Sequence, residues 1–137
     1  MIFHRLLMSS GTPFKPYIIN PDPENPEYLY EFEEIQATTF EDSGGRGTHW
    51  YTEWQVARDE LFSDIIIYTN RDFTNLESIV VSDLGMEMLQ EYYVRVRYAS
   101  PTEVSDWSNP VFAKTGLFES GVNEWADSIL DFSFLGF

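Results

Sequence analysis

Seven consecutive residues, 92–98, limit the possible folds more than any other part of the chain. Their sequence is Tyr-Tyr-Val-Arg-Val-Arg-Tyr. Successive side chains of an extended strand point to opposite faces, so one face would carry Tyr92, Val94, Val96 and Tyr98, and the other Tyr93, Arg95 and Arg97. The pattern predicts a β-strand that covers a core with its first face and meets water with its second.

Other short apolar or alternating segments follow one another at the close spacing of antiparallel sheets. We expect strands in residues 16–21, 28–40, 48–57, 65–68, 76–81, 92–98 and 111–113, with a bulge or break near Glu33 and Glu34 and a turn at residues 70–72. No helix of core-building length intervenes. The predicted fold class is all-β, an immunoglobulin-like sandwich of about seven antiparallel strands.

The predicted core is built around Trp54. Its expected members are Trp54, Val56, Tyr92, Val94, Val96, Trp107 and Phe112. The chain has no cysteine, which excludes disulfides and thiolate zinc sites. The fold must therefore depend on packing alone.

The chain is strongly acidic, with 23 Asp and Glu against 8 Lys and Arg and a net charge of −15. Such a charge repels phosphate backbones and anionic lipids, so we expect neither nucleic acid nor a membrane as partner. A charge of this size also serves simply to keep an aromatic-rich protein soluble. The apolar run at residues 1–8 is too short and interrupted for a secretory signal, and we expect no membrane span.

Several motifs, taken together, are similar to those of a fibronectin type III domain, and most of all to the version found in bacteriophage virion proteins. The motifs are His49 before Thr52-Glu53-Trp54-Gln55-Val56, Asp59 with Phe62, residues 92–98, and Ser105-Asp106-Trp107-Ser108 followed by Phe112 and Thr115. The resemblance spans residues 13–115 and is most specific from His49 onward. It departs from the family pattern at Met86, where a leucine is usual, and in a missing Pro-x-Thr approach to Tyr92.

The resemblance implies two structural roles. The Tyr92 hydroxyl would tie its strand to the preceding corner, and Trp107 would pack against the arginines of the neighbouring strand. For Arg95 and Arg97 themselves, cross-strand pairing with the chain's own acids is the expected arrangement.

The two ends of the chain differ in kind from the segment between them. We divide the chain into an N-terminal docking arm (1–12), a fibronectin type III-like domain (13–115) and an apolar C-terminal tail (116–137) that is partly helical by its spacing. The predicted partner-binding residues are Ile2, Phe3, Leu6, Leu7, Trp125, Ile129, Phe132, Phe134 and Phe137. Something must cover this apolar surface. Either a neighbouring molecule binds the two ends, or both ends fold back onto the chain's own sandwich.

No pattern in the sequence indicates catalysis. The two histidines, His4 and His49, lie in no recognisable motif, and we interpret His49 as a partly buried hydrogen-bonding residue at the start of a strand. The carboxylates lack calcium-loop spacing, and residues 44–47 lack the Lys-Ser or Lys-Thr of a phosphate loop. We expect no catalytic residue, no metal site and no cofactor.

The resulting hypothesis is a non-enzymatic structural protein of a bacteriophage virion, either a capsid decoration protein or a tail or fibre component. It would contact other virion proteins through its terminal segments and form a homo-oligomer or part of a larger assembly. The alternative is a recognition module that binds a host-surface glycan or protein through residues 42–48 and 100–106, with Trp50 and Trp107 as stacking platforms. An accessory domain of a hydrolase would need an active site on another chain.

Overall fold

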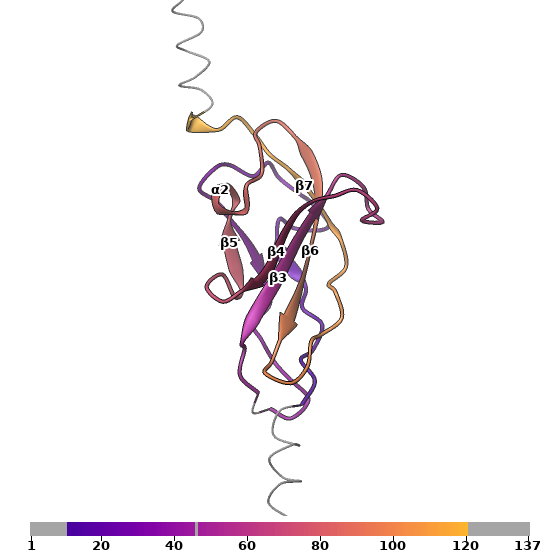
Figure 1. Ribbon diagram of the computed structural model, residues 1–137. Helices are drawn as coiled ribbons and strands as arrows, with labels where there is room; N and C mark the ends of the chain where they lie inside the picture. Colours follow the sequence, from indigo (N-terminus) through magenta and orange to yellow (C-terminus); the bar gives the residue numbers. More distant parts are fainter. Residues whose placement is uncertain (1–10, 46, 121–137) are drawn as a thin grey trace, which may run out of the picture.

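The computed structural model describes residues 11–45 and 47–120, and two layers of β-strands account for most of this part (Figure 1). The elements are β1 (Ile18–Asn20), β2 (Glu34–Ala37), β3 (Tyr51–Ala57), β4 (Ile65–Asp72), β5 (Ser78–Val80), α2 (Val81–Leu84), β6 (Glu91–Ala99) and β7 (Val111–Lys114). The short helix α2 ends at Gly85, whose φ of 90° suits a residue without a Cβ.

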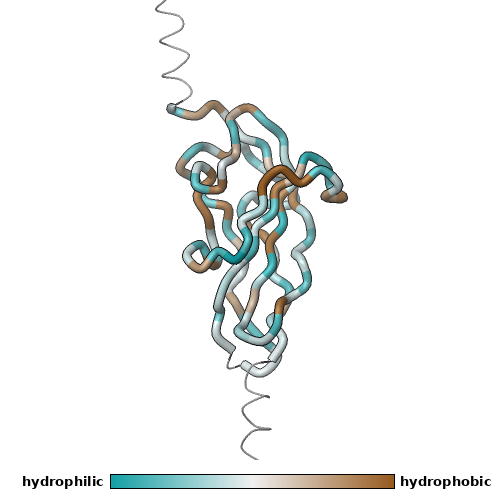
Figure 2. Tube along the Cα trace, viewed as in Figure 1, coloured by the Kyte–Doolittle hydropathy of each residue, from teal (hydrophilic) through white to brown (hydrophobic). Residues whose placement is uncertain are grey.

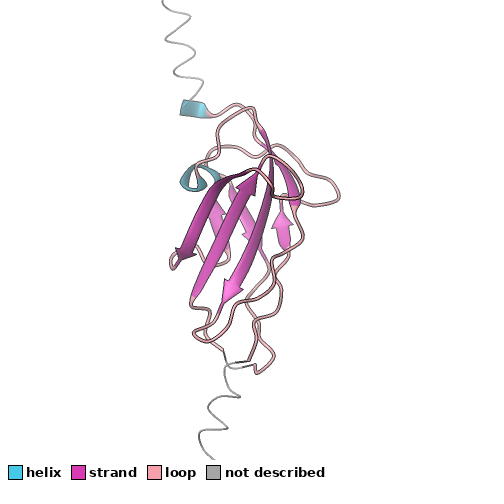
Figure 3. Ribbon diagram, turned by 45° about the vertical axis from the view of Figure 1, so that its right-hand side comes forward, coloured by secondary structure: helices cyan, strands magenta, loops and turns pink. Residues whose placement is uncertain are grey.

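The strands form two antiparallel sheets. The smaller sheet has the order β1-β2-β5, and the larger has the order β4-β3-β6-β7. Figure 3 shows the long strands of the larger sheet side by side, with shorter strands behind them. The predicted all-β sandwich of about seven antiparallel strands is confirmed.

The core fills the space between the two sheets. Trp54 is fully buried, and its indole N–H donates to the carbonyl of Asn75 at 3.0 Å, so its one polar atom is satisfied. Strand β6 presents Tyr92, Val94, Val96 and Tyr98 to this core, all at most 2% exposed. The alternation of residues 92–98 therefore sets the faces of β6 as predicted.

Strand β4 differs from its prediction. We expected a strand ending at Tyr68 and a turn at residues 70–72, whereas β4 continues to Asp72. Arg71 has a φ of 56°, and the pairing of β4 with β3 shifts between Thr52 and Trp54. The irregularity is thus an in-strand bulge, which bends the ladder without ending it. Of the two irregularities expected near Glu33 and Glu34, a bulge or a break, the structure has a break, because β2 begins only at Glu34.

The described chain enters and leaves the sandwich at opposite poles. In Figure 1 its indigo beginning lies at the lower end and its yellow end at the upper end. Strand β7 stops at Lys114, but Phe118 still packs into the core at 7% exposure, and the Ser120 hydroxyl donates to Glu31 at 2.6 Å. The chain is therefore anchored to the sandwich as far as Ser120.

Candidate functional site

The most elaborate side-chain arrangement covers the outer face of the larger sheet. The Arg95 and Arg97 guanidinium carbons lie 4.6 and 4.4 Å from the centroid of the Trp107 ring, and Arg95 also lies 4.2 Å from the ring of Phe62. Cations at these distances are attracted by the negative charge on the ring faces. The packing of Trp107 against both arginines, which the resemblance implied, is confirmed.

Polar partners hold the two arginines in place. Glu53, only 3% exposed, accepts from Arg97 at 2.7 Å and from the Tyr68 hydroxyl at 2.6 Å. Burial, followed by the hydrogen bond to Glu53, raises the pKa of Tyr68 above its ordinary value. Arg97 therefore pairs with an acid as expected, whereas Arg95 donates to the uncharged Gln55 at 2.8 Å. The hydrogen-bonding groups of this face thus bond to one another, and the face is a structural layer.

The same preference for aromatic rings extends over the described surface. Each lysine and arginine in residues 11–45 and 47–120 lies 4.2 to 5.9 Å from a ring centroid; these are Lys15, Arg58, Arg71, Arg95, Arg97 and Lys114. Within these ranges, only Arg97 forms an ion pair. The acidic side chains are thus mostly left to solvent, which keeps the surface strongly negative.

Tyr92 ties β6 to the preceding corner. Its hydroxyl oxygen accepts the backbone N–H of Glu87 at 2.9 Å, while its ring is buried in the core. This bond fixes the loop between α2 and β6, and it is the contact that the resemblance implied.

His49 forms a pair with Thr52 that resembles a base and a nucleophile. Its Nε2 lies 2.7 Å from Thr52 Oγ1, but the Thr52 hydroxyl donates its only hydrogen to the Leu76 carbonyl at 2.6 Å. His49 Nε2 is therefore the donor of the pair. Burial lowers the pKa of His49, although Glu77 acts in the opposite direction. Since Thr52 is fully buried, the pair is structural, and the interpretation of His49 as a partly buried hydrogen-bonding residue is confirmed.

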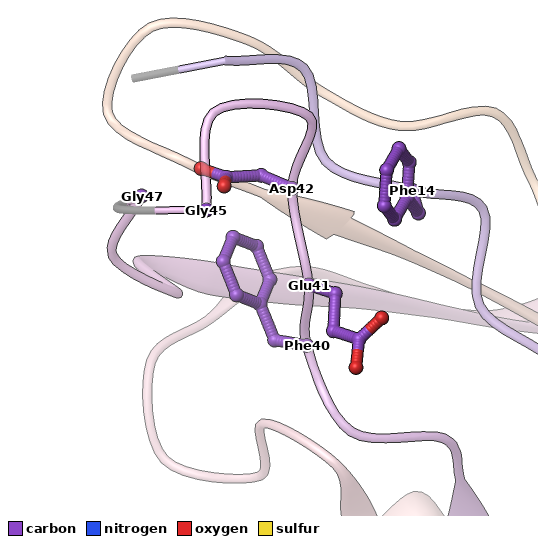
Figure 4. Close-up of a pocket in the computed structure, with 6 residues that line it drawn as sticks. All are labelled: Phe14, Phe40, Glu41, Asp42, Gly45 and Gly47. Carbon is purple, nitrogen blue, oxygen red and sulfur yellow. The ribbon is translucent and has the colours of Figure 1, made fainter. Parts of the chain in front are cut away.

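A hollow of about 380 Å³ lies beside the loop that the sequence marked as a candidate binding loop. Figure 4 shows the Phe40 ring and the Asp42 carboxylate directed toward Gly45 and Gly47, while the Glu41 carboxylate points away from them. A Cβ at Gly47 would overlap the carboxylate of Asp42, so only glycine allows this close approach. The two neighbouring carboxylates diverge and do not form an acid–base pair around a common point.

An aromatic cluster lies at the start of β3. Trp50 and Phe73 are 43% and 54% exposed, and both pack edge-to-face against the buried ring of Tyr51. Arg71, at the bulge of β4, lies 5.3 Å from the same Tyr51 ring. Of the two tryptophans expected to serve as stacking platforms, Trp50 is open to solvent, whereas Trp107 is covered by Arg95 and Arg97.

The predicted core residues fall into two groups. Trp54, Val56, Tyr92, Val94 and Val96 lie in the buried cluster. Trp107 and Phe112 are instead half-buried on the outer face. Phe112 pairs with Tyr93 across β6 and β7, while its neighbours Val111 and Ala113 face the core. The inner side of the segment around Trp107 is occupied by Ser105 and Ser108, whose hydroxyls accept the backbone N–H groups of Tyr98 and Val96 at 2.9 Å.

The predicted partner-binding residues lie outside the described part of the chain. These are Ile2, Phe3, Leu6, Leu7, Trp125, Ile129, Phe132, Phe134 and Phe137, together with the expected helix of the tail. In the described part, the sequence reasoning missed the roles of Phe62 and Tyr68 on the outer face, and the exposed pair Tyr28 and Tyr30. Alternation around buried Leu29 was the available signal for that pair.

Two kinds of feature are absent from the described residues. No group of three or more His, Asp or Glu side chains there is arranged to hold a metal ion. No helix in that part of the chain has the length and apolar character needed to cross a membrane.

Comparisons with known proteins show a structural likeness but no match in sequence. No protein-family model matches the chain, and no curated protein sequence matches it. Among solved structures, the chain is similar to part of the Streptomyces avermitilis α-L-rhamnosidase complexed with L-rhamnose, with 14% identity over 77% of this chain and a TM-score of 0.41. The native α-L-rhamnosidase from Aspergillus terreus gives 16% identity over 78% of the chain and a TM-score of 0.39.

The chain spans only 10% and 12% of the length of these two rhamnosidases. The likeness is therefore between a small β-sandwich domain and a minor portion of a much larger enzyme. At these identities and scores, it carries no argument about activity or substrate.

Proposed function

We propose that this chain is a non-enzymatic structural protein of a bacteriophage particle, a fibronectin type III-like module that decorates or joins a capsid or tail through its terminal segments. The observation that carries the proposal is the division of the chain. The described residues close a core of their own, and the chain enters and leaves that core at opposite poles (Figure 1). A module with this layout can connect one neighbour at each pole.

The apolar residues of the two ends supply the energy for such an assembly. Burying a large apolar side chain contributes about 1.5–3 kcal/mol, so four of the predicted anchors would contribute about 6–12 kcal/mol, which is of the same order as the ordering cost of an interface. The described sandwich adds apolar surface of its own along the free edge of β4, where Ile65, Ile66 and Tyr68 are 41%, 39% and 46% exposed. The three consecutive isoleucines of this edge are brown in Figure 2.

The virion assignment is based on the resemblance alone, and details of the fold bear on the type of module. The division of the strands into β1-β2-β5 and β4-β3-β6-β7, the Tyr92 corner and the Trp107–arginine packing all agree with a fibronectin type III-like module. The described polar clusters are used internally, which favours a structural role over a catalytic one.

The experiment that tests the proposal is mass spectrometry of purified particles combined with a density map that locates this polypeptide. The proposal predicts a fixed copy number per particle and density for the sandwich against a neighbouring virion protein. Absence of the polypeptide from purified particles would contradict it.

The alternative function, a module that recognises a cell-surface glycan or protein through its loops, is favoured by one observation. Trp50 and Phe73 expose aromatic surface next to Arg71 at one pole of the sandwich. This alternative predicts a monomer that keeps its ligand after removal of residues 121–137, whereas the structural proposal predicts loss of assembly. The deletion must begin after Ser120, because Phe118 belongs to the core.

A further inference from the structure

A second hollow, of about 370 Å³, opens between the segment before β2 and the end of β7. Its walls are Pro26, Glu27, Tyr28, Tyr30 and Lys114, and we call it the Tyr28–Tyr30 pocket. The volume lies near the lower end of the roughly 300–1,000 Å³ typical of ligand pockets, which suits a ligand of one or two rings.

The backbone holds both tyrosines in fixed directions. Leu29 is 2% exposed and points into the core, so Tyr28 and Tyr30 both point outward, and they are 52% and 49% exposed. The Leu29 N–H donates to the Lys114 carbonyl at 2.8 Å, and the Gly116 N–H donates to the Leu29 carbonyl at 2.9 Å. The pocket is therefore clamped to the end of β7.

The Tyr30 ring lies across Gly116. A Cβ at residue 116 would come within 2.5 Å of Tyr30 Cε1, so the glycine lets the ring approach the backbone. One side of this ring is thus supported by the chain, while about half of the residue remains open to solvent. This is a preformed apolar platform beside polar groups, which reduces the ordering cost of binding.

The charges at the pocket select the class of ligand. The Lys114 ammonium lies 4.4 Å from the Tyr28 centroid, so a cation already occupies the favourable place over this ring, and a second cation is disfavoured. Glu27 supplies an acceptor beside this donor. The best match is a neutral ligand that both donates and accepts hydrogen bonds and has a C–H face to lie against the negative face of an aromatic ring.

We propose that the Tyr28–Tyr30 pocket binds a single neutral pyranose unit of a glycan. The sugar's C–H face would lie on Tyr30, with its hydroxyls accepting from Lys114 and donating to Glu27. The pocket is lined by none of the predicted partner-binding residues and by neither of the loops at residues 42–48 and 100–106. Sugar binding and assembly therefore succeed or fail separately.

The test is a two-dimensional amide NMR titration of the full chain with the methyl glycosides of glucose, galactose, mannose and N-acetylglucosamine. We expect saturable shifts at Tyr28, Tyr30 and Lys114 with at least one glycoside, and at least tenfold weaker binding in Tyr30→Ala. Tyr17→Ala is the matched control, because Tyr17 is 53% exposed and also has a lysine, Lys15, at 5.8 Å from its ring; it should bind normally.

Thermal melts of each variant show whether it folds. If Tyr30→Ala does not fold, Tyr28→Ala takes its place, with the same expected weakening. The proposal is overturned if none of the four glycosides gives saturable shifts at the pocket, or if the folded pocket variant binds as well as Tyr17→Ala. Saturable binding at the pocket of a proline-rich peptide or a choline-type cation, without sugar binding, would also overturn it.

Discussion

The two faces of the larger sheet are built from the same strands but are covered in different ways. The inner face is sealed by apolar side chains around Trp54, with 0% exposure at its centre. Among the residues that the structure describes, no second sheet lies over the outer face, which is covered by Trp107 and Phe62 packed against Arg95 and Arg97. The stability of the inner face depends on the exclusion of water. The stability of the outer face depends on contacts between charged groups and aromatic rings at a partly exposed surface.

This difference teaches that a small cysteine-free sandwich can stabilise an open face without burying it. It also predicts unequal costs. A substitution on the inner face leaves a cavity, whereas one on the outer face removes only partly exposed contacts. Substitutions matched between the faces therefore test the comparison.

The largest effect is expected for Trp54→Ala, which should lower the free energy of unfolding by about 3–5 kcal/mol because it leaves a large cavity in the core. Urea denaturation followed by circular dichroism measures this change. Trp50→Ala is the matched control, and since Trp50 is 43% exposed, its cost should be about 1 kcal/mol or less. Equal losses in the two variants would remove the distinction between core and surface.

A smaller effect is expected for Trp107→Ala on the outer face. This variant loses two contacts with arginines, each contributing about 0.5–2 kcal/mol, so its total cost should be about 1–4 kcal/mol. Trp107→Leu keeps an apolar cover but removes the π face, so the difference between the two variants separates packing from the attraction to the arginines. A leucine variant as stable as the wild type would show that the rings act only as cover.

The next effect concerns a single hydrogen bond. Tyr92→Phe removes the acceptor for the Glu87 N–H while keeping the buried ring, and should cost about 0.5–1.5 kcal/mol. The control is Tyr93→Phe on the outer face, because the Tyr93 hydroxyl has no hydrogen bond within the described residues. Urea midpoints measured in parallel should fall for Tyr92→Phe only. A drop of the same size for Tyr93→Phe would show that the loss of stability does not come from the hydrogen bond between Tyr92 and Glu87.

The smallest effect is a pH dependence at His49. Burial lowers the pKa of His49 in the folded state, so the unfolded chain takes up the proton first as the pH falls below the ordinary value of 6.5. The stability from the neutral ring is complete above that pH and is lost as the pH falls through the lowered folded pKa. The stability difference between the wild type and His49→Gln should narrow between about pH 8 and about pH 5.5, and a constant difference would show that His49 does not titrate with folding.

The sequence predicted the inner face well because strict alternation leaves little freedom. Tyr92, Val94 and Val96 must share a face if any of them is buried, and Trp54 opposes Val96 across the sheet. The resemblance predicted the contact of Trp107 with the arginines, but its assignment to the core was wrong, because the two serines beside it accept backbone N–H groups of β6 and turn the indole outward. The orientation of the indole depends on contacts between segments that are distant in the sequence, and the local periodicity does not determine such contacts.

The bulge at Arg71 was missed for a related reason. Asn-Arg-Asp resembles a turn, but pairing with β3 keeps these residues in the sheet at the cost of one left-handed residue. The Tyr28–Tyr30 pocket also depends on long-range contacts, since the Tyr30 ring that lines it lies against the backbone at Gly116. Local patterns thus indicated which side chains point outward, but not which of them meet.

The most direct test of the central claim, that a self-sufficient sandwich assembles through its ends, is sedimentation velocity of the full chain beside the variant Phe132→Ser/Phe134→Ser. The account predicts concentration-dependent oligomers for the full chain, and a monomer with an unchanged urea midpoint for the variant. A full chain that sediments as a monomer at every concentration, together with a variant of lower stability, would contradict it, because the tail would then serve its own sandwich.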